Sequence, residues 1–147
     1  MNQPAFIKAR DEYDPALNVF GTAVTVMVAN DATTGHEITL QSGAEGCGPP
    51  PHRHDWDESF YVLEGNVEFT YGEAVRLCGP GAFVHLPAGT VHGFRYGKGG
   101  GRLLEVAGSG SGASSMFRAV DAEIRPGVDE AATAIAILRR HGISFGA

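Results

Sequence analysis

Short runs of β-branched and aromatic residues, each ended by glycine or proline, fill the middle of the chain. Residues 22–29 form a β-branched run that alternates imperfectly, as a strand buried on both faces would, and residues 37–41 alternate polar and apolar positions. Further short runs follow at 59–63, 67–71, 75–78, 83–86, 91–96 and 102–106. Between successive runs we expect a tight turn at Gly65 and a hairpin at 97–101. Many short strands at regular spacing predict an antiparallel sandwich or barrel.

The last third of the chain follows a different pattern. Residues 108–112 alternate glycine and serine, which is typical of a flexible linker. Residues 129–140 show helical spacing, with acidic residues at the start and arginines at the end. The apolar face of this predicted helix consists of Ala131, Ala134, Ile135 and Leu138. The pattern therefore divides the chain into an N-terminal arm (1–19), a β-barrel (20–107), a flexible linker (108–115) and a helical tail (116–147).

Composition limits the classes of function. The chain has 147 residues and is 43% hydrophobic, which suits one domain with a single core. A formal net charge of −6 without any basic run argues against a nucleic-acid partner. No apolar run approaches the ~20 residues of a membrane span, and the first residues lack the features of a signal peptide, so we expect no membrane partner and a cytoplasmic protein. Cys47 and Cys78 have no zinc-type spacing and are expected to be free thiols.

Two histidines and a glutamate follow a proline-rich stretch near the centre of the chain. Side chains at i and i+2 of an extended strand point to the same side, so His52 and His54 can bind one ion, and Glu58 opens the next apolar run. Prolines 49–51 exclude a helix directly upstream. A lone His-x-His in a polar loop is more often a pair of surface histidines. This spacing therefore needs support from elsewhere in the sequence.

The support comes from residues 81–92, where a Pro-x-Gly turn delivers His92 to the head of another short strand. Together the two stretches resemble the pair of motifs that define the cupin family. The matching residues are Gly46, His52, His54, Glu58 and Gly65 for the first motif and Gly81, Pro87, Gly89 and His92 for the second. Tyr96 stands where the second motif has an asparagine, which is not a metal ligand in the family. The resemblance covers about residues 20–107.

The resemblance implies an all-β fold, the double-stranded β-helix or small jelly-roll barrel of the cupins, here with a short C-terminal helix. It also implies one metal ion bound by His52, His54, Glu58 and His92, as in small bacterial cupins similar to quercetin dioxygenase. Three nitrogen ligands and one oxygen suit a divalent first-row transition metal. Ligand type excludes a dedicated calcium site but does not choose among Fe, Mn, Ni, Co, Cu and Zn.

Strand parity predicts the surroundings of the metal. If Glu58 points into the barrel, so do Phe60 and Val62, and if His92 points inward, so do Phe94 and Tyr96. The resulting pocket is apolar and aromatic, with the Tyr96 hydroxyl as a hydrogen-bond partner, and it suits a planar aromatic or polyketide-like ligand. Inward aromatic residues are also the usual filling of a small barrel, so both interpretations stay open.

The function that we favour from the resemblance is a quercetinase-like, metal-dependent dioxygenase. In such an enzyme the ion binds a small hydroxylated aromatic substrate, flavonol- or polyketide-like, and brings O2 beside it. Glu58 would be a ligand and, when it leaves the metal, a catalytic base. Two alternatives stay open. One is an isomerase or cyclase that uses the ion as a Lewis acid without O2, and the other is a ligand-binding cupin without catalysis.

The tail needs a partner surface, because a helix of about twelve residues is marginal alone in water. That surface is either the barrel of the same chain or a second subunit, and a homodimer is the arrangement that we expect. Phe117 and Phe145 would anchor the tail on both sides of the helix. Outward-pointing Tyr61 and Leu63 would contribute to the contact between subunits.

Overall fold

The computed structural model describes residues 4–145 and contains seven strands and two α-helices in those residues. The strands are β1 (Leu17–Val19), β2 (Thr22–Val28), β3 (Glu37–Gly43), β4 (Glu58–Tyr71), β5 (Ala74–Cys78), β6 (Phe83–Leu86) and β7 (His92–Ala107). A 3₁₀ turn (Asn30–Ala32) lies between β2 and β3, and the helices are α1 (Ala113–Glu123) and α2 (Glu130–Arg140). Neither helix is long and apolar enough to cross a membrane.

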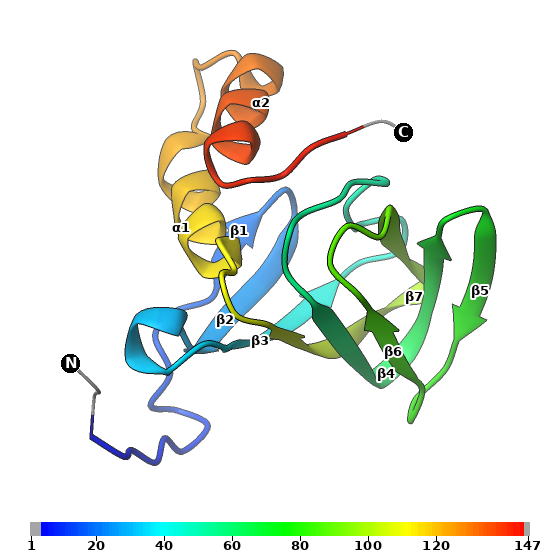
Figure 1. Ribbon diagram of the computed structural model, residues 1–147, viewed down its shortest axis with the longest axis horizontal. Helices are drawn as coiled ribbons and strands as arrows, with labels where there is room; N and C mark the ends of the chain where they lie inside the picture. The colour runs from blue at the N-terminus through cyan, green and yellow to red at the C-terminus, as the bar shows by residue number, and fades with distance from the viewer. Residues whose placement is uncertain (1–3, 146–147) are drawn as a thin grey trace.

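The strands form one antiparallel sheet in the order β1-β2-β3-β7-β4-β5, with β6 paired to β4. β4 and β7 pair along most of their length, and their N-terminal ends lie close to the segment before β4 (Figure 1). The predicted all-β jelly-roll architecture is confirmed, with two C-terminal helices in place of one. Both cysteines are free, as predicted.

The predicted turns at Gly65 and at 97–101 are wrong. β4 runs through Gly65 and β7 through 97–101, and the register between them shifts on either side of this position. Gly65 has φ +71°, and a Cβ there would collide with the carbonyl oxygen of Gly100. The glycines therefore allow two long strands to bend together as a bulged pair, where the sequence pattern suggested that the chain reverses.

The segment predicted as a flexible linker is held in place, and α1 begins inside it at Ala113. The amide of Gly108 donates to the carbonyl oxygen of Asp57 at 2.7 Å, and Ser111 is buried. The buried Glu37 carboxylate accepts hydrogen bonds from the amide and the hydroxyl of Ser114. A carboxylate from β3 thus binds free donors of the first turn of α1, which fixes the helix against the sheet.

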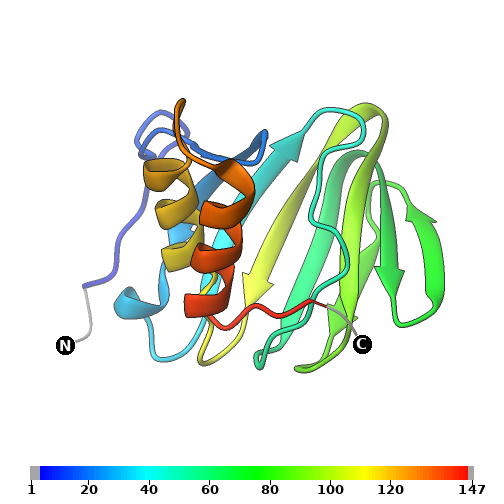
Figure 2. The ribbon, with the colours of Figure 1, turned by 90° about the horizontal axis from the view of Figure 1, so that it is seen from above.

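The predicted helix at 129–140 is confirmed as α2, and Asp129 caps it by accepting from the Ala132 amide at 3.0 Å. The predicted apolar face is right for Leu138, which packs against buried hydrophobic residues, but wrong for Ile135. Ile137 is fully buried, whereas Ile135 is 45% exposed. The reason is that α2 lies beside α1, which the sequence pattern did not predict (Figures 1 and 2). The covered side of α2 is therefore set by its contact with α1 of the same chain, a partner that neither alternative for the tail named, and the homodimer stays a prediction.

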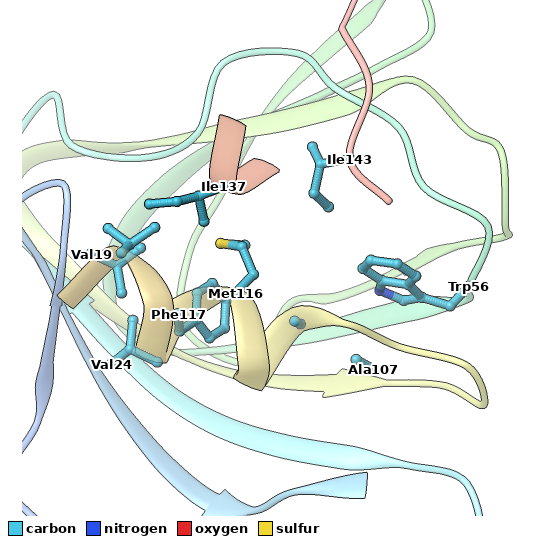
Figure 3. Packing of buried hydrophobic residues seen from close by; sticks show 10 residues of the cluster. Val19, Val24, Trp56, Ala107, Met116, Phe117, Ile137 and Ile143 are labelled. Atoms are coloured by element: carbon cyan, nitrogen blue, oxygen red, sulfur yellow. The ribbon is translucent and has the colours of Figure 1, made fainter. Parts of the chain in front are cut away.

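Two groups of buried hydrophobic residues make up the core. We call the first the barrel-interior cluster: Phe60, Val62, Val67, Phe69, Leu86, Phe94, Tyr96 and Leu103. We call the second the tail cluster: Val19, Val24, Trp56, Ala107, Ala113, Met116, Phe117, Val120, Ile137 and Ile143 (Figure 3). The first lies between strands alone, and the second joins strands, the segment before β4 and both helices. The candidate site lies where the two clusters meet.

Candidate metal centre

Backbone pairing brings the two histidine segments together although they lie far apart in the sequence. The amide of His52 donates to the carbonyl oxygen of His92 at 2.8 Å, and the amide of His92 donates back at 2.9 Å. His92 is the first residue of β7, and Glu58 is the first residue of β4. The bridge between His52 and His92 thus brings the start of β7 to the segment that leads into β4.

Each of the three imidazoles is oriented by a backbone carbonyl nearby in the sequence. The Nδ1 atoms of His52, His54 and His92 lie 2.9, 3.0 and 2.8 Å from the carbonyl oxygens of Pro50, Trp56 and Thr90. A carbonyl oxygen can only accept, so Nδ1 carries the proton in every ring. The Nε2 atom of each neutral ring is then left with a free lone pair, as a metal ligand requires.

The three histidines and Glu58 converge. One ligand atom from each of His52, His54 and His92 lies within 4.8 Å of the others. The Oε2 atom of Glu58 lies 3.0 Å from His54 Nε2 and 2.7 Å from His92 Nε2. Because Nδ1 holds the ring proton, these contacts need either a second proton or a cation between carboxylate and imidazole. The donor set thus fits a divalent transition metal in place of those protons. The structure places all four predicted ligands together, with Glu58 in contact with two of the three rings.

Charges within this group alter its proton affinities. Burial opposes ionisation of Glu58, but hydrogen bonds from His54 and His92 outweigh it and hold the pKa of Glu58 well below its usual range. Burial likewise disfavours charge on His92, yet its hydrogen bond to Glu58 raises the pKa of His92. Burial and the neighbouring His92 lower the pKa of His52 to about 4. His52 is therefore neutral and able to bind a metal well into the acidic range.

A second buried carboxyl group, Glu105, lies close to the ligands and was not predicted. Its oxygens accept from Gln41 Nε2 at 3.0 Å and from Thr39 Oγ1 at 3.3 Å. Burial and then the charge of Glu58 raise the pKa of Glu105 well above its usual range. The sequence did carry a signal. Glu105 lies two residues from both Leu103 and Ala107, so all three share the buried side of β7, where a charged residue is unusual.

Trp56 was also missed. Its indole stacks on the His54 ring with centroids 4.1 Å apart and an angle of 6° between the planes, and it is 5% exposed. The residue sits in an irregular segment between two ligands, where no strand or helix period applies. Trp56 thus contacts His54 twice, with its backbone carbonyl at Nδ1 and with its indole on the face of the ring.

A cavity of about 170 Å3 adjoins the histidines. Of the four predicted pocket residues, Phe60 and Phe94 line it, whereas Val62 and Tyr96 lie in the barrel-interior cluster. The Tyr96 hydroxyl is buried and has no hydrogen-bond partner among residues 4–145. The remaining wall includes Gln41, Glu105, residues of β1 and β2, the proline-rich segment and several residues of the tail. The cavity is thus mostly apolar, with its polar groups gathered at the metal-ligand end.

Comparison with known proteins agrees with this geometry. The model of the cupin domain family matches residues 36–106. Quercetin 2,3-dioxygenase of Bacillus subtilis (strain 168) is 39% identical over 80 residues, which cover 52% of this chain and 24% of that protein. Residues 36–106 of the chain are thus a cupin domain. The matched part of this cupin thus spans only about a quarter of the curated relative.

Solved structures show the same fold at low identity. KdgF from Halomonas sp. has a TM-score of 0.65 at 19% identity, over 72% of this cupin and 94% of that chain. The polyketide cyclase RemF from Streptomyces resistomycificus has a TM-score of 0.62 at 23% identity, over 71% of this cupin and 80% of that chain. At these identities the likeness is one of fold, and the chemistry of this cupin has to be argued from its own site.

Proposed function

We propose that this cupin is a metal-dependent dioxygenase that acts on a small hydroxylated aromatic substrate. The observation that carries the proposal is the convergence of three carbonyl-oriented imidazoles and Glu58 at the wall of an apolar cavity. The similarity to quercetin 2,3-dioxygenase, 39% identical over 80 residues, supports the same reaction class. His52, His54, Glu58 and His92 would hold one ion of Fe, Mn, Ni, Co, Cu or Zn. When bound, the ion supplies Lewis acidity and, if it is redox-active, a route for electrons between substrate and O2.

The side chains of this cupin provide the rest of the chemistry. Glu58 is placed to take the proton of a substrate hydroxyl, because its Oε2 faces the cavity end at which the imidazoles meet. Phe60 and Phe94, whose ring centroids are 5.4 Å apart, offer an aromatic surface for a planar ring. Val62 and Tyr96 support these two rings from within the barrel.

Oxygen uptake tests the proposal. Purified protein, after elemental analysis, is offered hydroxylated aromatic compounds in an oxygen electrode. We expect O2 consumption that is lost in His54→Ala and strongly reduced in Glu58→Gln. The matched control is His85→Ala on β6, since His85 is exposed and bonded to Ser59. Wild-type protein that binds the metal but consumes no O2 with any of these compounds would contradict the proposal.

A second candidate is an O2-independent cyclase or isomerase, and the observation that favours it is Glu105. Two buried carboxyl groups, Glu58 and Glu105, line one cavity, so one can accept a proton while the other donates one. Such a reaction would proceed under argon at the same rate as in air. Product formation measured without O2 therefore separates the two functions, and ligand binding without turnover in either atmosphere indicates a binding protein.

A further inference from the structure

The cavity beside the histidines has two walls from different parts of the chain. Strand residues such as Phe60, Phe94 and Gln41 form one wall. The other wall consists of Ala113, Met116, Phe117, Leu138, Ile143 and Phe145. Every residue of this second wall lies beyond residue 106, where the match to the cupin domain ends. The tail therefore sets the far limit of the space next to the metal ligands.

Backbone hydrogen bonds fix the tail relative to the ligands. The amide of Ser144 donates to the carbonyl oxygen of Arg53 at 3.0 Å, and the amide of Arg53 donates to Ser144 at 2.9 Å. Arg53 stands between His52 and His54, so the chain after α2 pairs with the ligand segment itself. Figure 2 shows this segment running back from α2 past the ends of the strands. The far wall consequently has a set distance from the metal site.

The volume of the cavity, which is partly open to the outside, limits how much of a ligand it holds. The cavity measures about 170 Å3, and an apolar cavity of about 150 Å3 takes one benzene ring. A single substituted ring therefore fills the available space. A flavonol, with a second ring system attached to the first, would displace Met116 and Phe117 or leave part of itself outside.

Trp56 offers a polar contact within the same cavity. Its indole Nε1 is buried and has no hydrogen-bond partner among the described residues, and the side chain lines the cavity. Figure 3 shows the indole extending from the backbone toward the side of the tail cluster occupied by Met116 and Phe117. A buried donor without a partner is unfavourable. A ligand that presents an acceptor oxygen to Nε1 would therefore form a hydrogen bond that no described residue provides.

We propose that the cavity binds a single-ring hydroxylated aromatic compound that carries a second oxygen acceptor for the Trp56 N–H, and that the tail excludes ligands of two or more ring systems. This inference rests on the proposed function for one point, that a ring hydroxyl points to the metal-ligand end. The size limit and the Trp56 contact follow from the tail and the indole themselves.

Binding of two probes to the whole protein, as purified and under argon, tests the size limit. The chain contains a single tryptophan, so quenching of its fluorescence reports directly on this cavity. We expect 3,4-dihydroxybenzaldehyde to bind at least tenfold more tightly than quercetin. Met116→Ala should reduce this ratio severalfold. Phe145→Ala should act in the same direction and is the safer variant for folding, since Phe145 is 48% exposed.

The matched control for these tail variants is Ile135→Ala, which removes a side chain from the exposed side of α2. It should leave the ratio unchanged. Wild-type protein that binds quercetin as tightly as the single-ring probe would overturn the size limit. The size limit would also be overturned if the ratio of the two affinities were the same in wild type, Phe145→Ala and Met116→Ala.

The Trp56 contact is tested by calorimetry, because Trp56→Phe keeps an aromatic ring beside His54 but removes both the N–H and the fluorophore. In wild type the benzaldehyde probe should bind more tightly than catechol, which lacks the carbonyl. In Trp56→Phe this advantage should fall by about tenfold, as expected for one buried hydrogen bond. An equal loss for both probes would overturn the assignment of the donor.

The outcomes also separate this inference from the proposed function. If O2 is consumed with quercetin and not with single-ring compounds, the dioxygenase stands and the single-ring site is overturned. If the single-ring probe binds selectively and no compound supports O2 uptake, the site stands and the dioxygenase is overturned.

Discussion

The barrel-interior cluster and the tail cluster differ in the elements that build them. In the barrel interior, Phe60, Phe69 and Phe94 meet one another with centroid distances of 5.4 to 5.6 Å. In the tail cluster, Met116 and Phe117 pack against residues of strands, helices and the segment before β4, and they line the cavity together with Phe60 and Phe94 of the barrel-interior cluster. Strands alone supply the packed rings, whereas residues of the tail complete the cavity.

The two clusters have different roles in the molecule. The strand-built cluster holds the fold and brings β4 and β7 together, so that the metal ligands at their ends converge. The tail-built cluster closes the space in front of those ligands. Changes in the first should therefore appear mainly as lost stability, and changes in the second as altered ligand choice.

Removal of the tail should have the largest effect. Truncation after Ala107 exposes Val24 and Trp56, which are at most 5% exposed in the whole chain. We expect a protein that aggregates or no longer unfolds cooperatively, because part of the core has lost its cover. Light scattering and circular dichroism measure this outcome. A soluble truncated protein with an unchanged melting curve would show that the tail cluster is not part of the core.

A core aromatic should matter more in the barrel interior than in the tail cluster. Phe69→Ala leaves a cavity between packed rings and should cost about 3–5 kcal/mol of unfolding free energy. Phe117→Ala should cost less, because Phe117 is 8% exposed whereas Phe69 is 2% exposed. Urea denaturation compares the two, with Phe83→Ala, 66% exposed on β6, as a control near zero. Equal losses for Phe69 and Phe117 would mean that the clusters are packed alike.

Metal binding should stabilise the junction of the two clusters. A ligand present at a hundredfold its Kd stabilises the folded state by about 2.7 kcal/mol, so metal-loaded wild type should melt well above His54→Ala. A chelator should lower the melting temperature of wild type and leave that of His54→Ala nearly unchanged. His85→Ala should behave as wild type in both conditions. If the chelator affects no variant, His54 does not hold a metal.

The smallest effect concerns Glu105 and depends on pH. The raised pKa of Glu105 means that the folded state holds the carboxyl proton more tightly than the unfolded state does. The protonated carboxyl group therefore contributes to the stability of the folded state at low pH, and this contribution is lost as the pH rises above about 4.5. In chelator-treated protein, Glu105→Gln should therefore gain stability over wild type between about pH 5 and pH 8. The gain in stability corresponds to about 1.4 kcal/mol for each tenfold difference in the proton affinity of Glu105 between the folded and unfolded states. Denaturation curves at several pH values measure it, and a difference that is constant with pH would contradict the raised pKa.

The sequence by itself indicated the candidate metal ligands and the class of fold. The resemblance to the two cupin motifs singled out His52, His54, Glu58 and His92, which stand at the beginning of strands or just before one. Local alternation likewise marks the strands and the helix α2. These signals are short-range, so they can be seen without knowledge of what packs against what.

Only the tertiary structure decided what surrounds those ligands. The sequence around Gly65 suggests a turn, but in the structure Gly65 lies within β4, against Gly100 of β7. The apolar pattern of α2 does not show that α1 covers Ile137 and leaves Ile135 exposed. Glu105 and Trp56 approach the ligands from segments that have no motif spacing to them. The physical reason is that burial and packing depend on contacts between distant parts of the chain. Periodicity tells which side of a strand or helix is apolar, but the partner element decides which side is covered and how much space remains.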